Sequence, residues 1–352
     1  MASTRRLTQR DIARMTGVSQ ATVSLVLNGR ADGEVRIAPE TRDRVLQAIR
    51  DSGYVADPIA RRLAAQHNRI IGVFGYEPVF GVGSAHFYHP FLVGIEEQAE
   101  AQGSDLLLLT SAPVVDGRRR IFHEGNRIRL ADGCILLGRS LDPEDLQRLL
   151  HDGLPFVSVG RRDDAGGPVP YVGADYPSAV AELVQQAAAL GHERMAYVGE
   201  GAGPESWADR MSGFQAGAAA TGVEVRHERG PDLAAVLESI LQAGVTAVLV
   251  EEYSDAVALA RLAAGRGLAV PLDLSVLTLG QPTRPVQGEP LQFTGFEIPR
   301  HQMGREAVQV LTGLIDGSGR RPQRLLPCPL VEGATLAPPR RRRTSRKQGN
   351  GA

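Results

Sequence analysis

Short apolar runs alternate with longer helical patterns along most of the chain, from residue 70 onward. RIIGVFG, DLLLLT, CILLG and PFVSVG form a first set of runs, and MAYVGE, TAVLVEE and LSVLTLG form a second. Such runs are typical of strands buried on both faces of a sheet. The stretches between them, such as HPFLVGIEEQAEAQG and YPSAVAELVQQAAALGH, are typical of helices. The pattern predicts two similar α/β halves, each a doubly wound parallel sheet with right-handed crossovers.

The first 57 residues, here called the head, instead contain two short helical patterns around one glycine. Thr8 can cap a first helix, and Asp11 can return a hydrogen bond to the cap. Gly17 permits the left-handed backbone of a tight turn, after which Ser19 can cap a second helix. Two helices so close in sequence must cross steeply, as in a helix-turn-helix whose second helix enters the DNA major groove. A plain helical hairpin is the alternative.

A third helix would close a small core in this all-α head. Pro39 has the fixed φ that suits a first helical position, and Gly53 can end the helix. The expected core residues are Ile12, Ala13, Met15, Val18, Val23, Val26, Leu27, Val45, Leu46 and Ile49.

The outer face of the second helix is short and uncharged, which suits contact with base edges. The candidate DNA-contacting residues of the head are Thr8, Ser19, Gln20, Ala21, Thr22, Ser24, Leu25 and Asn28.

Charge is distributed unevenly along the chain. Residues 1–69 contain 12 arginines and 7 acidic residues, and residues 338–352 contain 6 basic residues and no acidic one. Because the total is -1, residues 70–337 carry -12. A basic head on an acidic body indicates that the head meets a polyanion. The segment 338–352 is basic and poor in apolar residues, so it is expected to be a disordered tail.

Three segments resemble the start of regulators of the lactose/galactose repressor family: LTQRDIARMTGVSQATVSLVLNG, ETRDRVLQAIRDSGY and DPIARRLAAQHNRIIGV. The resemblance continues through HPFLVGIE, ADRMSGF and EPLQFTGFEIPRHQMGREAVQVL, so it covers nearly the whole chain. It implies a head that binds a near-palindromic double-stranded DNA operator as a homodimer. It also implies a core like that of periplasmic binding proteins, with an effector held between two subdomains.

The resemblance implies that residues 58–69 form a hinge helix and linker. A helix of about eight residues is too short to be stable alone in water, so it needs a partner. In this family the segment orders in the dimer on DNA, and a leucine wedges into the minor groove, a position that Leu63 occupies. Ala60, Arg61 and Ala64 would lie beside it on the DNA, and Arg62 would face phosphates. Ordinary linker residues are the alternative.

Three crossings between subdomains are implied near residues 170, 290 and 322. The first subdomain would then comprise about 70–170 and 291–321, and the second about 171–290 and 322–337.

The family positions also nominate effector-binding residues. Arg210, in ADRMSGF, stands where the family holds effector hydroxyls or carboxylates, and Trp207 could stack on a ring. Phe91 and Leu92 match an apolar wall of the cleft.

Several positions depart from the family pattern. Leu25 stands where a polar residue is common, so a guanine contact is replaced by a thymine methyl contact. Gly160 stands where many members have Asp, and Glu252 and Tyr253 replace an Asn-Asp pair. A buried Glu251 or Glu252 would need a donor such as Arg210. A carbohydrate-like effector, a cationic or amine-bearing ligand, and no ligand at all therefore stay open.

The sequence offers no candidate for catalysis. It contains neither GxxxxGK[ST] nor GxSxG, and its glycine-rich stretches lack the spacing of a dinucleotide loop. His86 and His89 lack a nearby carboxylate or further histidine for a metal site, and Cys134 and Cys328 lie far apart. No cofactor is expected. Because no run is long enough for a membrane span and the N-terminus is charged, a cytoplasmic location is expected.

The sequence thus predicts a dimeric, effector-controlled DNA-binding transcriptional regulator, a repressor in the first instance. A stand-alone small-molecule binding protein without operator binding is the main alternative. An enzyme on an α/β scaffold is a third, since fold alone does not fix function.

Overall fold

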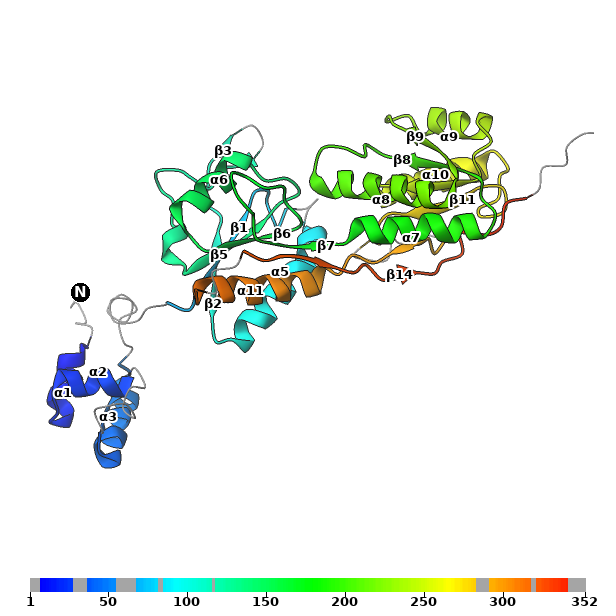
Figure 1. Ribbon diagram of the computed structural model, residues 1–352. Helices are drawn as coiled ribbons and strands as arrows, with labels where there is room; N and C mark the ends of the chain where they lie inside the picture. The colour runs from blue at the N-terminus through cyan, green and yellow to red at the C-terminus, as the bar shows by residue number, and fades with distance from the viewer. Residues whose placement is uncertain are drawn as a thin grey trace, which may run out of the picture. The chain divides into compact units, whose positions relative to one another are not determined.

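The computed structural model describes residues 7–27, 37–54, 68–81, 85–115, 118–282, 291–317 and 321–340. They fall into two units, one ending at Asn68 and the other starting at Arg69, and each unit is described separately (Figure 1). The hinge segment Pro58 to Ala65 and Asn28 lie outside the described residues.

Three helices form the head: α1 (Gln9–Thr16), α2 (Gln20–Leu27) and α3 (Pro39–Ser52). The capping box predicted for α1 is present, because Thr8 Oγ1 accepts from the backbone N–H of Asp11 and the Asp11 carboxylate accepts from the backbone N–H of Thr8. Gly17 has φ +68°, the left-handed conformation that the turn requires. Ser19 Oγ accepts from Thr22 N at 3.1 Å, so the start of α2 is also as predicted.

The head has its own core, in which Ile12, Val23 and Val45 are fully buried and Val26 nearly so. Met15 was expected in this core, but its side chain is 58% exposed. The buried residues of α1 are Ile12, Ala13 and Thr16, and Met15 lies about 60° around the helix from Ile12, on the side away from Ala13. Two crossed helices closed by a third are the observed architecture, in place of a plain hairpin.

The first subdomain of the core contains a six-stranded sheet, with the order β13-β7-β6-β5-β1-β2 and all strand pairs parallel. The strands are β1 (Ile70–Gly75), β2 (Asp105–Leu109), β5 (Gly133–Leu137), β6 (Phe156–Val159), β7 (Tyr171–Ala174) and β13 (Gln323–Leu326). A separate hairpin joins β3 (Val114–Val115) to β4 (Arg118–Arg119).

The second subdomain contains another six-stranded sheet, with the order β14-β12-β11-β10-β8-β9. The strands are β8 (Arg194–Val198), β9 (Glu224–Glu228), β10 (Ala247–Val250), β11 (Ser275–Thr278), β12 (Thr294–Phe296) and β14 (Leu330–Val331). Only the edge strand β14 runs antiparallel, so the predicted parallel sheet is confirmed except at this edge.

The structure places the three crossings a few residues later than the approximate positions 170, 290 and 322. Strands β7 and β13 pair within the first sheet, although both were placed in the second subdomain. Strand β12 pairs within the second sheet, although it was placed in the first. Each crossing therefore follows a strand, because a strand completes its ladder before the chain leaves the sheet.

Helices cover the sheets in closely packed pairs. In the first subdomain, α5 (Ala85–Ala101) lies beside α11 (Arg300–Ile315), and α6 (Pro143–Asp152) packs elsewhere on the same sheet (Figure 1). A Cβ at Gly94 would collide with the backbone of α11, so this glycine permits the close approach.

In the second subdomain, α7 (Tyr176–Ala189) and α8 (Glu205–Thr221) form the corresponding pair, and α9 (Leu233–Gln242) contacts α10 (Tyr253–Gly265). A short 3-10 turn, η2 (Ile128–Leu130), precedes β5.

Strand β2 is less buried than its sequence predicts. Leu106 and Leu108 of β2 are 39% and 36% exposed, although DLLLL was expected to be buried on both faces. A strand at the edge of a sheet has a neighbour on one side only, which leaves its side chains less covered.

The tail was expected to be disordered from residue 338, yet Arg340 is described and forms an ion pair with Asp273 at 2.7 Å.

Candidate functional site

The carboxyl ends of strands from both sheets supply the residues of a cleft between the two subdomains of the core. Arg139 follows β5, Arg161 follows β6, Tyr176 follows β7, and Glu251 and Glu252 follow β10. Open α/β sheets bind ligands at this end, because the loops there are free to diverge from the sheet. The topology of the two sheets therefore determines where the cleft lies.

The cleft contains two cavities, of about 230 Å³ and about 70 Å³. The larger one is lined by Phe87, Arg139, Tyr176, Pro204, Ser206, Trp207, Arg210, Glu251, Glu252, Tyr253, Leu279, Gly280, Gln281, Pro282, Ile298 and Arg300. Residues of both subdomains therefore face one space. Of the predicted effector residues, the structure brings Trp207, Arg210, Glu252 and Tyr253 together here.

Arg210 is held rigidly in the cleft wall. Its Nε donates to the Leu279 carbonyl at 2.8 Å, and its Nη1 donates to the Ser206 carbonyl at 2.9 Å. The guanidinium plane lies over the ring of Tyr176, 4.0 Å from its centre. The side chain is 8% exposed. Such a fixed guanidinium presents its remaining donors to the cavity with little loss of conformational entropy on binding.

Glu251 is buried, as the sequence indicated, but Arg210 is not its hydrogen-bond partner. Its Oε2 accepts from the Tyr197 hydroxyl and from the backbone N–H of Gly201, both at 2.9 Å. Its Oε1 is buried and has no hydrogen-bond partner. The expected internal neutralisation by Arg210 is therefore corrected: a hydroxyl and a backbone amide satisfy one carboxylate oxygen, and the other is buried without a partner.

Glu252 and Tyr253 line the same cavity. The Glu252 side chain is exposed. Partial desolvation nevertheless raises its pKa, and the positive charges of Arg210 and Arg139 act in the opposite direction. Tyr253 packs edge-on against Phe293, with ring centres 5.5 Å apart. Trp207 is half-buried at the start of α8 and lines the larger cavity.

Phe91 and Leu92, which were predicted to form an apolar wall of the cleft, lie in different surroundings in the structure. Phe91 is 5% exposed and lines the smaller cavity. Leu92 packs against the hydrophobic core and lines neither cavity. The two are consecutive residues on α5, about 100° apart around the helix, so only one of them can face the cleft.

The sequence reasoning missed a pair of arginines that join the subdomains. Arg161 Nε donates to both carboxylate oxygens of Asp209, at 2.9 and 2.7 Å. Arg162 is 4% exposed, donates to Glu205 at 3.1 Å and also donates to the carbonyl of Gly138. Both arginines follow β6, and both acids lie on α8. The doublet GRR after a buried strand was the available signal, because an arginine there must find a carboxylate or an acceptor.

Arg139, Arg300 and Phe87 were also missed. The guanidinium carbons of Arg139 and Arg300 lie 5.1 and 5.4 Å from the centre of the Phe87 ring. Neither arginine forms an ion pair among the described residues. Burial lowers the pKa of Arg300, and its Nε is buried without a hydrogen-bond partner.

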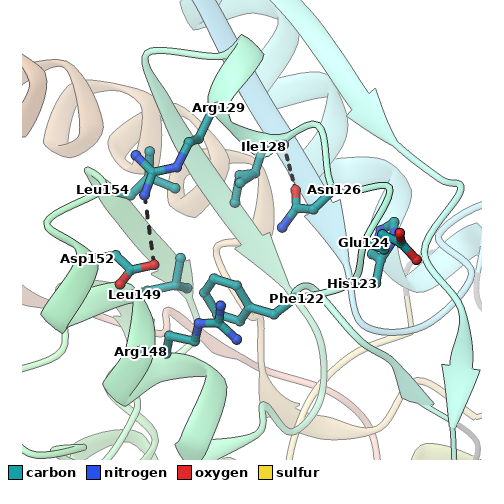
Figure 2. Close-up of a pocket in the computed structure, with 10 residues that line it drawn as sticks. All are labelled: Phe122, His123, Glu124, Asn126, Ile128, Arg129, Arg148, Leu149, Asp152 and Leu154. Carbon is teal, nitrogen blue, oxygen red and sulfur yellow. Dashed lines mark hydrogen bonds and ion pairs between the residues drawn. The ribbon is translucent and has the colours of Figure 1, made fainter.

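A cavity of about 470 Å³ lies in the first subdomain, where Arg148 stacks on Phe122 at 4.1 Å and Arg129 pairs with Asp152 at 3.8 Å (Figure 2). Although this cavity is larger, its lining comes from one subdomain and its two arginines are already engaged. The smaller cleft between subdomains is the better candidate, because closure of the two subdomains can change its shape.

The outer face of α2 in the head is accessible. Ser19, Gln20 and Ala21 are exposed, and Thr22, Ser24 and Leu25 are half-buried. The Gln20 amide oxygen accepts from Arg10 Nε at 3.2 Å. Thr8 is exposed, although its hydroxyl is engaged in the cap of α1.

Three further observations concern metals, thiols and membranes. In the ranges that the structure describes, no three histidines, cysteines or acids are grouped as metal ligands. Cys134 and Cys328 are both buried, and burial raises the pKa of the Cys328 thiol to about 12. In the same ranges, no helix is both long enough and apolar enough to cross a membrane.

Comparison with known proteins matches both units. The lacI family of bacterial regulatory proteins matches residues 8–57, and a periplasmic binding protein-like domain matches residues 184–336. The HTH-type transcriptional regulator CelR of Thermobifida fusca is 29% identical over 93% of this chain and 97% of its own length. Catabolite control protein A of Priestia megaterium is 27% identical over 86% of this chain and 90% of its own.

Solved structures agree with these matches. A complex of the transcriptional regulator CelR with cellobiose has a TM-score of 0.61 at 27% identity, covering 94% of this chain and 100% of the other. The lac repressor dimer bound to operator and the anti-inducer ONPF has a TM-score of 0.72 at 21% identity, covering 95% and 100%, and shows the shared fold. The chain belongs to the lacI (lactose/galactose repressor) family and is a DNA-binding transcriptional regulator.

Proposed function

We propose that the protein is a repressor that binds a near-palindromic operator as a homodimer and is controlled by a small carbohydrate-like effector. As a DNA-bound regulator it would act in the cytoplasm. The observation that carries the proposal is the occurrence, in one chain, of an accessible α2 in the head and a two-subdomain cleft built around the rigid Arg210.

The DNA contacts are proposed from the accessible face of α2. Short polar side chains there can reach base edges in the major groove, and Leu25 can contact a thymine methyl group. Two heads related by a two-fold axis would read two half-sites about one helical turn apart. The remaining proposed contacts are Asn28 and, in the hinge segment, Ala60, Arg61, Leu63 and Ala64.

The effector contacts are proposed from the larger cavity. Arg210 would donate to ligand oxygens, Trp207 would pack on a ring face, and Glu252 and Tyr253 would close the mouth. The cellobiose complex of CelR supports a saccharide as the general ligand class. Phe91 would supply apolar contact from the smaller cavity.

Control of DNA binding requires that the effector bind one state of the core more tightly than the other. A ligand with equal affinity for both states would bind and change nothing. The cleft meets the structural requirement, because a ligand that contacts both subdomains senses their separation.

An Arg210→Ala variant tests the assignment. We expect operator binding to persist and its response to effector to be lost, because the fixed donors of Arg210 are removed while the head is unchanged. Arg266→Ala, an exposed position on the opposite end of α10 from the cleft, is the matched control. An intact effector response in Arg210→Ala would remove Arg210 from the binding site.

A further inference from the structure

Two residues that line the larger cleft cavity each have a buried polar atom without a hydrogen-bond partner, one a donor and the other an acceptor. One is the donor Nε of Arg300, at the start of α11 in the first subdomain, and the other is the acceptor Oε1 of Glu251, after β10 in the second. A buried polar group without a partner costs free energy, so each atom indicates a complementary ligand group. Glu251 is 7% exposed, which leaves bulk water little access to its carboxylate.

The ligand group that faces Glu251 must donate a hydrogen bond. Oε2 of this carboxylate is already satisfied by Tyr197 and Gly201, so Oε1 is the oxygen available to a ligand. A sugar hydroxyl is a donor of the right kind, and a hydrogen bond to an ionised acceptor is stronger than one between neutral groups.

Arginines outnumber carboxylates in the lining of the cavity, where Glu251 and Glu252 are the two acids. Arg139, Arg210 and Arg300 all line it, and none of the three forms an ion pair within the described part of the chain. Their guanidinium groups lie over the rings of Phe87 and Tyr176. Because Nε and Nη1 of Arg210 already donate to backbone carbonyls, the donors that remain for a ligand are its Nη2 and the edges of Arg139 and Arg300. Arg161 and Arg162 nearby are instead neutralised by Asp209 and Glu205.

A neutral sugar would leave Arg300 without an ion-pair partner in the described part of the chain, whereas Arg139 and Arg210 act on Glu252. Burial lowers the pKa of Arg300, and repulsion from Arg210 acts in the same direction, against the opposing effects of Tyr176 and Glu297. A carboxylate or phosphate would relieve this repulsion and accept charge-assisted hydrogen bonds from the same groups.

We propose that the effector is an acidic polyhydroxylated compound, such as a sugar acid or a sugar phosphate. Its anionic group lies among Arg300, Arg139 and Arg210, and a hydroxyl donates to Glu251 Oε1. Arg300 and Arg139 are thereby the residues that determine specificity for acidic over neutral saccharides. This inference rests on the proposed function of the cleft as an effector site.

Thermal unfolding of the full chain tests the anion site without knowledge of the effector. Sodium phosphate is compared with sodium chloride at equal ionic strength, and gluconate and glucose 6-phosphate are compared with glucose. We expect phosphate and at least one of the two sugar anions to raise the melting temperature of the core more than the chloride and glucose controls. A larger effect of gluconate identifies a carboxylate ligand, and a larger effect of glucose 6-phosphate identifies a phosphate ligand.

Variants then locate the effect. Arg300→Gln and Arg139→Gln should each weaken anion binding about tenfold or more, the loss typical of a charge-assisted contact. Arg266→Gln, which removes the same charge from an exposed position, should leave it unchanged. Glu251→Gln should weaken binding of the sugar anions more than that of inorganic phosphate, because phosphate has no hydroxyl frame that reaches Oε1.

The proposal is overturned if the anions stabilise the protein no more than their controls, or if their effect survives in both arginine variants. Operator binding by the full chain, measured separately, tests the regulatory function itself. Retained operator binding with no anion effect would reject the acidic ligand alone. Loss of all sequence-specific DNA binding would instead reject the proposed function.

Discussion

Arg161 and Asp209 form a bidentate contact between the two subdomains of the core, with Nε donating to both carboxylate oxygens at 2.9 and 2.7 Å. Arg161 follows strand β6 of the first sheet, and Asp209 lies on α8 of the second subdomain, one residue before Arg210. The pair therefore connects the separation of the subdomains to the position of the residue that we assign to the effector.

Asp209→Asn should favour separation of the subdomains, because it removes the charge that holds Arg161. We expect a loss of about 1–3 kcal/mol in the stability of the core, since Asp209 is 8% exposed and the arginine would keep its charge. Chemical denaturation checks this. Arg194→Gln, which breaks the exposed pair with Glu224, should cost less than about 1 kcal/mol. Equal losses in the two variants would contradict a special role for the Arg161 contact.

Ile12→Ala should unfold the head selectively. Ile12 is fully buried in a core of few residues, and truncating a buried isoleucine to alanine costs about 2–5 kcal/mol. Operator binding should be lost while the ligand-induced shift in the melting temperature of the core persists. Met15→Ala, at an exposed position of the same helix, is the control and should bind operator normally. Normal operator binding by Ile12→Ala would contradict the assignment of the head core.

Gly213→Ala should destabilise the second subdomain by about 1–3 kcal/mol, the usual effect of overpacking. A Cβ at this position would collide with the backbone of Pro177, so α8 would be forced away from α7. Gly265→Ala, in α10, meets no atom within 4 Å and should be stabilising by about 0.5–1 kcal/mol through helix propensity. Equilibrium unfolding of the two variants checks both signs, and destabilisation by both would indicate an effect unrelated to helix packing.

The stability of the core should fall as the pH drops below about 6.5, the ordinary pKa of histidine. Burial lowers the pKa of His192, whose ring nitrogens lie 2.8 Å from the Thr246 hydroxyl and 2.9 Å from the Ala337 carbonyl. At pH values below 6.5 the unfolded chain therefore binds more protons at this position than the folded chain, and stability rises with pH. His192→Gln should flatten this part of the pH profile, whereas His151→Gln, which changes an exposed side chain on α6, should not. An unchanged profile in His192→Gln would assign the pH dependence to another group.

Local signals in the sequence predicted the helix starts and the strands well. Thr8, Asp11, Gly17 and Ser19 act over three or four residues, and the structure confirms each of them. The buried strands were recognisable because parallel strands covered on both faces need continuous apolar runs. The exposed strand β9, EVRHE, has no such run, and it was missed because its place at a sheet edge depends on pairing with β8.

The cleft was only partly predictable. Arg210 and Trp207 were found through their positions in ADRMSGF, and the structure places both in the larger cavity. Arg139 and Arg300 lie 161 residues apart in the sequence, so nothing local shows that both pack on Phe87. The partner of Glu251 was predicted wrongly for the same reason: Tyr197 and Gly201 reach it only through the pairing of β8 with β10.

Selection of bound sequences from random and genomic duplexes, at moderate ionic strength, tests the central claim most directly. The full chain should enrich a near-palindromic site, its enrichment should change when the effector is added, and a chain lacking residues 1–69 should enrich nothing while still binding the effector. Enrichment of the same site by the truncated chain, or no preference by the full chain for any sequence over random duplex, would contradict the account.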